Sequence, residues 1–208
     1  MDISRASLES SEAGRGLHLR NERALLAGIL VLALASRLVF VLQMRSSPFF
    51  DHPALDQGLY VEAGKAVAAG REIHPGPLFR PPLYGWWLGL VFKLFGDGLL
   101  LPRLLQSVIG TASVWLVYRV GKLAFDARVG LVAALFASTY WVLVYYDGEL
   151  LREPIANPLN LIGVLATIRI ARGPSRSSIV LAGLAIGFSA LLRPQVLAVV
   201  PFFAAWLL

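Results

Sequence analysis

The sequence predicts an all-α protein, a polytopic bundle of transmembrane helices with a long extracytoplasmic loop that contains short interfacial helices. Three observations predict this class. Hydrophobic residues make up 57% and charged residues 15% of the 208 residues, and the mean hydropathy is +0.67. Apolar segments of membrane-spanning length recur along the chain, and basic residues gather in alternate connections. This composition excludes a disordered chain and argues against an ordinary soluble domain.

The first element follows a polar tail. Residues 1–23 carry Arg15, Arg20 and Arg23 just ahead of an apolar run from 24 to 44, which is about 20 residues long and can cross roughly 30 Å of hydrocarbon. A secretory signal peptide would have a shorter apolar region and a small-residue cleavage site. We therefore expect a cytoplasmic N-terminus at 1–23 and an uncleaved first span that opens a membrane module over 24–208.

The later spans are predicted at 100–121, 128–146, 155–171 and 178–193. Basic clusters between 119 and 128 and between 169 and 176 predict that both connections lie on the cytoplasmic side of the membrane. We expect this membrane to be a bacterial inner (plasma) membrane. Residues 45–99 and 147–154 then share the opposite side. The net charge of +6 is explained by this topology, and we expect no nucleic-acid partner.

Two short helices are predicted inside the 45–99 loop. The segment 83–95 is only about 13 residues long, contains Lys93 and is rich in aromatic residues, which is typical of a helix at the headgroup boundary. The segment 56–70 follows Pro53 and ends at Gly70, a common helix stop.

The last apolar run, 196–208, is about 13 residues long, below the roughly 17 needed to cross a membrane. We expect the sequence to be a copy of something longer, truncated at its C-terminal end.

Acidic residues from two parts of the chain face the same compartment. Asp56 begins the loop helix and Glu153 begins the 155–171 span, and either carboxylate can serve as a general base or help to bind a divalent metal cation. The alternatives are an N-cap role for Asp56 and a charge–dipole role for Glu153. We interpret Asp147 and Glu149 as solvated loop charges.

Three arginines are candidates for phosphate binding or for contact with lipid headgroups. Arg80 precedes Pro81 and Pro82, and Arg193 follows a span directed outward. Arg37 lies inside the first span and is expected either to pair with an acid or to snorkel outward. Two loop histidines, His52 and His74, lack metal-ligand spacing, and the chain has no cysteine.

Four stretches together resemble a known family. They are L-D-Q-G-L-Y-V-E-A-G-K-A-V-A-A-G (55–70), F-R-P-P-L-Y-G-W-W-L-G-L-V-F-K-L-F-G (79–96), Y-Y-D-G-E-L-L-R-E-P (145–154) and A-G-L-A-I-G-F-S-A-L-L-R-P (182–194). The chain resembles the N-terminal membrane module of the C-type (GT-C) glycosyltransferases that use polyprenyl-phosphate sugars, near the protein O-mannosyltransferase-like and aminoarabinose-transferase-like branches.

The resemblance implies a role for each candidate. Asp56 matches the acid of the first extracytoplasmic loop, which activates the acceptor or helps to bind a metal, and Glu153 matches a second acidic position. Arg193 matches an Arg-Pro pair that could face phosphate. Some branches carry a Glu-Lys pair where this chain has Arg80, and that departure favours lipid-phosphate binding at this position over a metal role.

The implied function is transfer of a hexose or pentose from a polyprenyl-phosphate sugar donor to a lipid, protein or glycan acceptor on the extracytoplasmic face. Full members have roughly a dozen spans, so we expect this chain alone to be inactive or weakly active. The alternative is a non-catalytic membrane subunit or polyprenyl-lipid-binding protein, completed by a partner subunit. A secondary transporter is disfavoured because the charges gather at one surface and not at the midplane.

Overall fold

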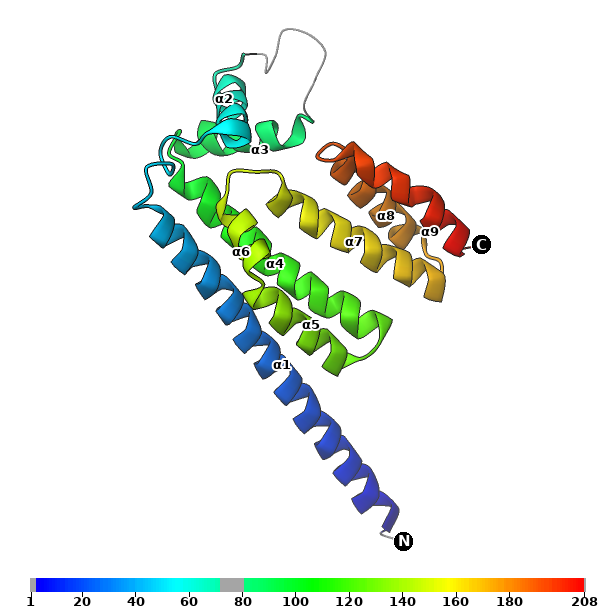
Figure 1. The fold of residues 1–208 in the computed structure, drawn as a ribbon. Coiled ribbons are helices and arrows are strands. Elements are labelled where there is room, and N and C mark those ends of the chain that lie inside the picture. Colours follow the sequence, from blue (N-terminus) through cyan, green and yellow to red (C-terminus); the bar gives the residue numbers. More distant parts are fainter. Residues whose placement is uncertain (1–2, 72–80, 208) are drawn as a thin grey trace.

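The computed structural model describes residues 3–71 and 81–207, and it describes the side chains of 21–71 and 81–206. Every regular element in this part of the chain is a helix (Figure 1), which confirms the predicted all-α class. Among the described residues three helices are long and apolar enough to cross a membrane, or four if a bent pair of helices forms one span. The three are α1 (Ile3–Met44), through its part Asn21–Met44, α4 (Leu100–Ala124) and α7 (Glu153–Arg172).

The span predicted at 128–146 is broken in the structure. Its two parts, α5 (Ala127–Thr139) and α6 (Trp141–Gly148), are bent by 55°. Tyr140 adopts an extended conformation at the break, and the freed carbonyl of Ser138 accepts hydrogen bonds from α1, from Ser36 Oγ at 3.2 Å and from Arg37 Nη1 at 3.4 Å. Because lipid offers no water to such a carbonyl, the break is tolerated where α1 covers it.

The last elements are short helices, close to the lengths that the sequence predicts. The predicted span at 178–193 forms α8 (Arg176–Ala190), whose 15 residues fall short of the roughly 17 needed to cross a bilayer. It packs against α7 and continues into η1 (Pro194–Val199) and α9 (Val200–Leu207). The helix ends ahead of Pro194, which restricts Arg193 to an extended conformation.

Helix α4 is the centre of the bundle and packs against α1, α5, α6 and α7. Its crossing with α5 is close because glycines face each other: a Cβ on Gly121 would lie 2.8 Å from the Cα of Gly130. Small residues at such crossings let two backbones approach and gain van der Waals contact, the main attraction between helices in lipid. The contact holds the first half of the broken span firmly against α4.

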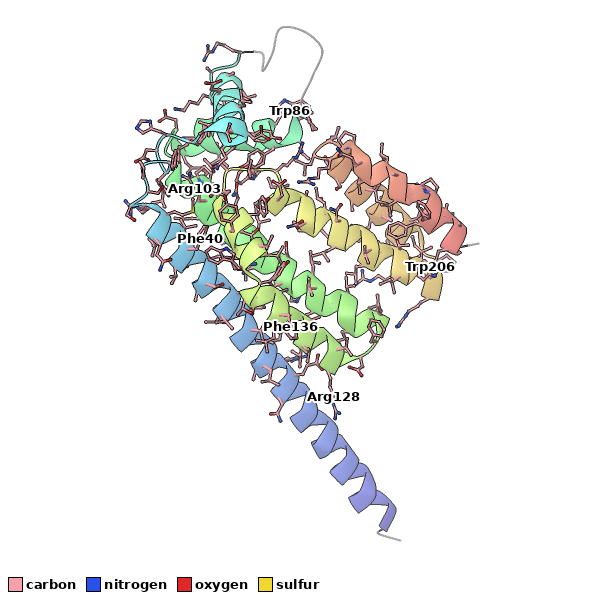
Figure 2. All side chains as sticks on the ribbon, in the orientation of Figure 1. Phe40, Trp86, Arg103, Arg128, Phe136 and Trp206 are labelled. Atoms are coloured by element: carbon pink, nitrogen blue, oxygen red, sulfur yellow. The ribbon has the colours of Figure 1, made fainter. Side chains whose placement is uncertain are left out.

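The 45–99 segment forms the two predicted short helices, α2 (Leu55–Ala68) and α3 (Leu83–Phe95). They lie together across one end of the bundle (Figure 1), and we call this end the α2–α3 end. Gly64 and Gly89 make the pairing of α2 with α3 possible, because a Cβ on either would overlap the other helix. Trp86 on α3 stays 46% exposed (Figure 2), as expected of an aromatic residue at a headgroup boundary.

The two segments predicted to share one side of the membrane lie at the same end of the bundle. Tyr60 of α2 and Tyr84 of α3 share an apolar core with Leu150 of the 147–154 connection, so both segments lie at the α2–α3 end. The two basic connections meet at the opposite end, where Arg172 of α7 donates a hydrogen bond to the carbonyl of Leu123 at the end of α4.

Candidate active site

The first candidate acid lies at the beginning of α2. Asp56 is exposed and occupies the first turn, while Ala54 holds the N-cap position and makes no side-chain cap. The N-cap alternative for Asp56 is therefore not what this helix uses. A carboxylate in the first turn still complements the helix dipole, and the side chain remains accessible from the α2–α3 end.

The backbone just before Asp56 is strained. Leu55 has a positive φ of 53°, the only non-glycine residue with positive φ in the described part of the chain, and its side chain is 89% exposed. A branched side chain in this region costs of the order of 1–3 kcal/mol. Gly58 permits the turn, since a Cβ there would lie 2.8 Å from the carbonyl oxygen of Pro53. Strain of this kind persists only where neighbouring contacts fix the segment.

One of those contacts connects the two acidic regions. Gln57, next to Asp56, accepts a hydrogen bond from the backbone N–H of Leu150 at 3.2 Å. Leu150 is fully buried and packs in the apolar core with Tyr60 and Tyr84. The beginning of α2 is thereby fixed on the 147–154 connection, three residues before Glu153.

The interpretation of Asp147 and Glu149 as solvated charges was wrong. Asp147 is 2% exposed and Glu149 is 7% exposed, because the 147–154 connection folds inward over the end of the bundle. Asp147 Oδ2 accepts a hydrogen bond from Nε of Arg37 at 2.7 Å, and both side chains are almost completely buried. Of the two alternatives for Arg37, pairing with an acid is the one observed. The pair ties α1 to α6.

Two polar side chains of α4 form hydrogen bonds to the backbone at the beginning of the 147–154 connection. Nε of Arg103 donates to the carbonyl of Gly148 at 3.2 Å, and the Gln106 amide donates to the carbonyls of Asp147 at 3.1 Å and Glu149 at 2.6 Å. The Gln106 oxygen accepts the hydroxyl of Tyr84 at 2.5 Å. Burial raises the pKa of Tyr84 well above its ordinary value, so this hydroxyl stays protonated and acts as a donor.

Arg103 reaches the junction between the bundle and the loop. Its guanidinium lies 4.0 Å from the centre of the Phe50 ring, a cation–π contact, and Figure 2 shows it at the end of α4 nearest α2 and α3. The side chain is fully buried, and its Nη2 has no hydrogen-bond partner among the described residues. Arg103 thus supports the connection from inside and does not face solvent.

The second acid and one candidate arginine are neighbours in space. Arg193 donates to Glu153, although 40 residues separate them. The Arg193 side chain is 45% exposed and that of Glu153 18% exposed. Oε2 of Glu153 is buried without a partner among the described residues. Arg152 strengthens the junction by donating to the carbonyl of Leu192 at 3.3 Å.

Two predicted residues, Arg80 and His74, lie outside the described residues. Within the described part, no group of three or more histidine, aspartate and glutamate side chains is arranged to hold a metal ion. Asp56 and Glu153 therefore do not by themselves form a full ligand set among the described residues.

A cavity of about 270 Å³ lies inside the bundle beneath this network. Its polar wall contains the Arg37–Asp147 pair and two asparagines of α7, Asn157 and Asn160. Asn160 accepts a hydrogen bond from the Ser189 hydroxyl of α8 at 2.5 Å. The remaining lining is mainly aliphatic.

Sequence reasoning missed Gln57, Arg103 and Gln106. A signal for the two α4 residues was present, because a charged and an amide side chain three positions apart in an otherwise apolar helix are costly unless partnered. Gln57, in the first turn of a short loop helix, carries no comparable signal.

Comparison with protein families decides the assignment. A family model described as dolichyl-phosphate-mannose-protein mannosyltransferase matches residues 79–208. The chain belongs to this family. It is thus an integral membrane protein of a glycosyltransferase family, as the resemblance implied. The matched range 79–208 contains Glu153 and Arg193, whereas Asp56 lies before it. Comparison with curated proteins and with solved structures finds no match.

Proposed function

We propose that this chain transfers a sugar from a polyprenyl-phosphate donor to an acceptor hydroxyl at the α2–α3 end of the bundle. The observation that carries the proposal is the junction between α2 and the 147–154 connection. Through the Gln57–Leu150 hydrogen bond and the core around Leu150, the α2 turn with Asp56 is joined to the segment that leads into Glu153.

The chemistry assigned to this end is a displacement at the sugar's anomeric carbon. The acceptor oxygen forms a bond to that carbon, the bond from carbon to the phosphate oxygen breaks, and the polyprenyl phosphate leaves with the electron pair. Asp56, exposed at the beginning of α2, takes the acceptor proton as general base. Arg193, and Arg80 on the sequence evidence, stabilise the negative charge that develops on the leaving phosphate.

Glu153 acts together with Arg193. One carboxylate oxygen accepts from the guanidinium and orients it, and the other has no partner among the described residues. That second oxygen can accept a hydrogen bond from a hydroxyl of the sugar or the acceptor. Because Arg193 is 45% exposed, it can hold Glu153 and bind a phosphate at once.

The membrane orientation follows from the charges. Arg119, Lys122 and Arg169 gather at the end opposite α2 and α3. The positive-inside rule places that end, and the N-terminus of α1, in the cytoplasm, so the site faces the extracytoplasmic side of the inner (plasma) membrane. A donor with a membrane-embedded tail would present its phosphate at this boundary.

The test uses the purified chain in lipid vesicles, with binding of a polyprenyl-phosphate mannose and sugar transfer measured separately. Asp56→Asn should keep donor binding and reduce transfer by about 10²- to 10⁴-fold, the usual contribution of a general base. Arg193→Gln should instead weaken donor binding. The matched control is Asp97→Asn, because Asp97 is an exposed acid after α3 that pairs only with Lys65, at 3.3 Å, among the described side chains.

The outcomes separate the candidate functions. Transfer that survives in Asp56→Asn would overturn the role of Asp56. Because the chain alone is expected to be at most weakly active, the assay is repeated with the membrane proteins that copurify with it. Donor binding that still gives no transfer to any lipid, peptide or glycan acceptor would favour the non-catalytic subunit that binds polyprenyl lipids. Loss of transfer on adding a metal chelator, with recovery on adding Mg²⁺ or Mn²⁺, would show that a divalent cation takes part.

A further inference from the structure

The end of the bundle opposite α2 and α3 contains two adjoining cavities. One, of about 300 Å³, is lined from α1 and α4, and the other, of about 230 Å³, is lined from α4 and α7. Arg119 and Lys122 line both. Arg23 of α1 and Arg169 of α7 complete a set of four cationic side chains around these two cavities, which together we call the basic pocket.

Little of this charge is neutralised within the described part of the chain. Glu22 is the one acid in the lining, and it accepts hydrogen bonds from Lys122, at 2.5 Å, and from the Tyr118 hydroxyl. The Arg119 guanidinium lies 5.0 Å from the centre of the Trp115 ring, a contact that orients the cation without neutralising it. Arg169 makes no side-chain hydrogen bond or ion pair to a described residue. Two guanidinium groups therefore face the pocket without an anion.

The pocket also has the mixed walls of a lipid site. Arg119, Lys122 and Arg169 lie in the last turns of the spans α4 and α7, and Arg23 lies in the first turn of the span Asn21–Met44, so all four lie where a helix leaves the hydrocarbon. Trp115, Leu123 and Leu165 supply apolar surface beside them. A soluble anion would use only the charges, whereas a phospholipid uses the charges for its phosphate and the apolar walls for the glycerol and the first carbons of its chains.

We propose that the basic pocket binds the phosphate headgroup of an anionic phospholipid from the leaflet at this end of the bundle. The site is distinct from the proposed transfer site, which lies at the other end of α4. The bound lipid would join α1, α4 and α7 by giving their cationic side chains a shared anion.

The experiment measures lipid binding to the purified, detergent-solubilised chain by native mass spectrometry, with short-chain phosphatidylglycerol and phosphatidylcholine as probes. Wild-type protein should retain phosphatidylglycerol in preference to phosphatidylcholine. Arg119→Gln/Arg169→Gln should weaken phosphatidylglycerol binding by about 10- to 30-fold, because each cation near an anionic lipid contributes about fivefold. Arg119→Lys/Arg169→Lys keeps the charges and should retain most of the binding, which also controls for folding.

The matched control is Arg128→Gln/Arg176→Gln. It removes the same charge from exposed positions that line neither cavity, and Figure 2 shows Arg128 at this end of the bundle. An equal loss of binding in this control would assign the effect to diffuse surface charge and overturn the pocket. Equal retention of both lipids by wild-type protein would also overturn it. Competition by inorganic phosphate at concentrations similar to those of the lipid would show a soluble-anion site instead.

Discussion

The Arg37–Asp147 pair is sealed inside the bundle, with side chains 1% and 3% exposed, whereas Arg193 in its pair with Glu153 is 45% exposed at the α2–α3 end. Both pairs join distant segments, yet their surroundings differ. Nη1 of Arg37 also donates to the carbonyls of Ala33 and Ser138, so the inner guanidinium joins α1 to both halves of the broken span. The outer pair keeps an exposed guanidinium and an unpartnered carboxylate oxygen.

The difference indicates a division of labour. A buried ion pair contributes little net stability over an apolar replacement, but it fixes geometry because an unpaired partner would be costly. A surface pair is worth about 0–1 kcal/mol, and in the outer pair the exposed partner is Arg193, whereas Glu153 is 18% exposed. The inner pair therefore holds α1 and the break between α5 and α6, while the outer pair keeps an exposed guanidinium that a ligand can reach.

The largest effect is expected from Asp147→Leu, which leaves the Arg37 guanidinium buried without its anion. We expect a loss of about 3–5 kcal/mol in unfolding free energy. The measurement is unfolding of the purified protein in mixed micelles, followed by tryptophan fluorescence. Arg37→Met/Asp147→Leu removes both charges and should recover most of the loss. A double variant as unstable as the single one would show that the pair is needed for more than charge balance.

The next effect concerns the support beneath the 147–154 connection. Gln106→Leu removes two hydrogen bonds to buried carbonyls and leaves the Tyr84 hydroxyl without its acceptor. A buried polar group left unpaired costs about 1–3 kcal/mol, so we expect Gln106→Leu to lower the unfolding free energy by about 3 kcal/mol in total. Gln106→Leu/Tyr84→Phe should be less unstable than the sum of its single variants, because each removes the other's partner. Additive losses in the same unfolding assay would contradict the hydrogen-bond network.

A smaller loss is expected where the inner pair meets α4. A Cβ on Gly110 would overlap the carboxylate of Asp147 and approach Nε of Arg37 to 2.7 Å. Gly110→Ala should therefore destabilise the protein by about 1–3 kcal/mol, the cost of forcing an extra group into a packed interior. The matched control is Gly183→Ala in α8, where an added Cβ has nothing within 4 Å. Alanine favours a helix more than glycine does, so this control should leave the unfolding free energy unchanged or raise it by up to about 1 kcal/mol.

The contrast between the two pairs also separates what the sequence could predict from what it could not. Spans such as α1 and α4 were predictable because lipid requires long apolar runs, and the basic residues indicated which connections lie together at one end of the bundle. Short helices in the 45–99 segment were predictable from length and aromatic content. Gly70 was correctly expected to end α2, and its φ of +70° gives the reason.

The inner polar network was not predictable in the same way. Whether Asp147 is solvated depends on an arginine 110 positions earlier and on a connection that folds inward, and neither is visible in local sequence. The break at Tyr140 has no adjacent glycine or proline to mark it, because it is permitted by donors from α1. For the outer pair, the Arg-Pro at 193–194 and the Glu-Pro at 153–154 were visible as motifs, but their contact was not.

The smallest expected change in stability belongs to Arg193→Gln, and it is the sharpest test of the division of labour. Breaking a pair with this exposure should change the unfolding free energy by less than about 1 kcal/mol. If Arg193 binds the donor phosphate, the same substitution should weaken donor binding by about 10- to 100-fold, in the range of a lost charge-assisted hydrogen bond. The inner-pair variant Gly110→Ala should show the reverse, with lower stability and donor affinity nearly unchanged in the folded fraction. A large stability loss in Arg193→Gln, or unchanged donor binding, would mean that the outer pair is a structural clamp like the inner one.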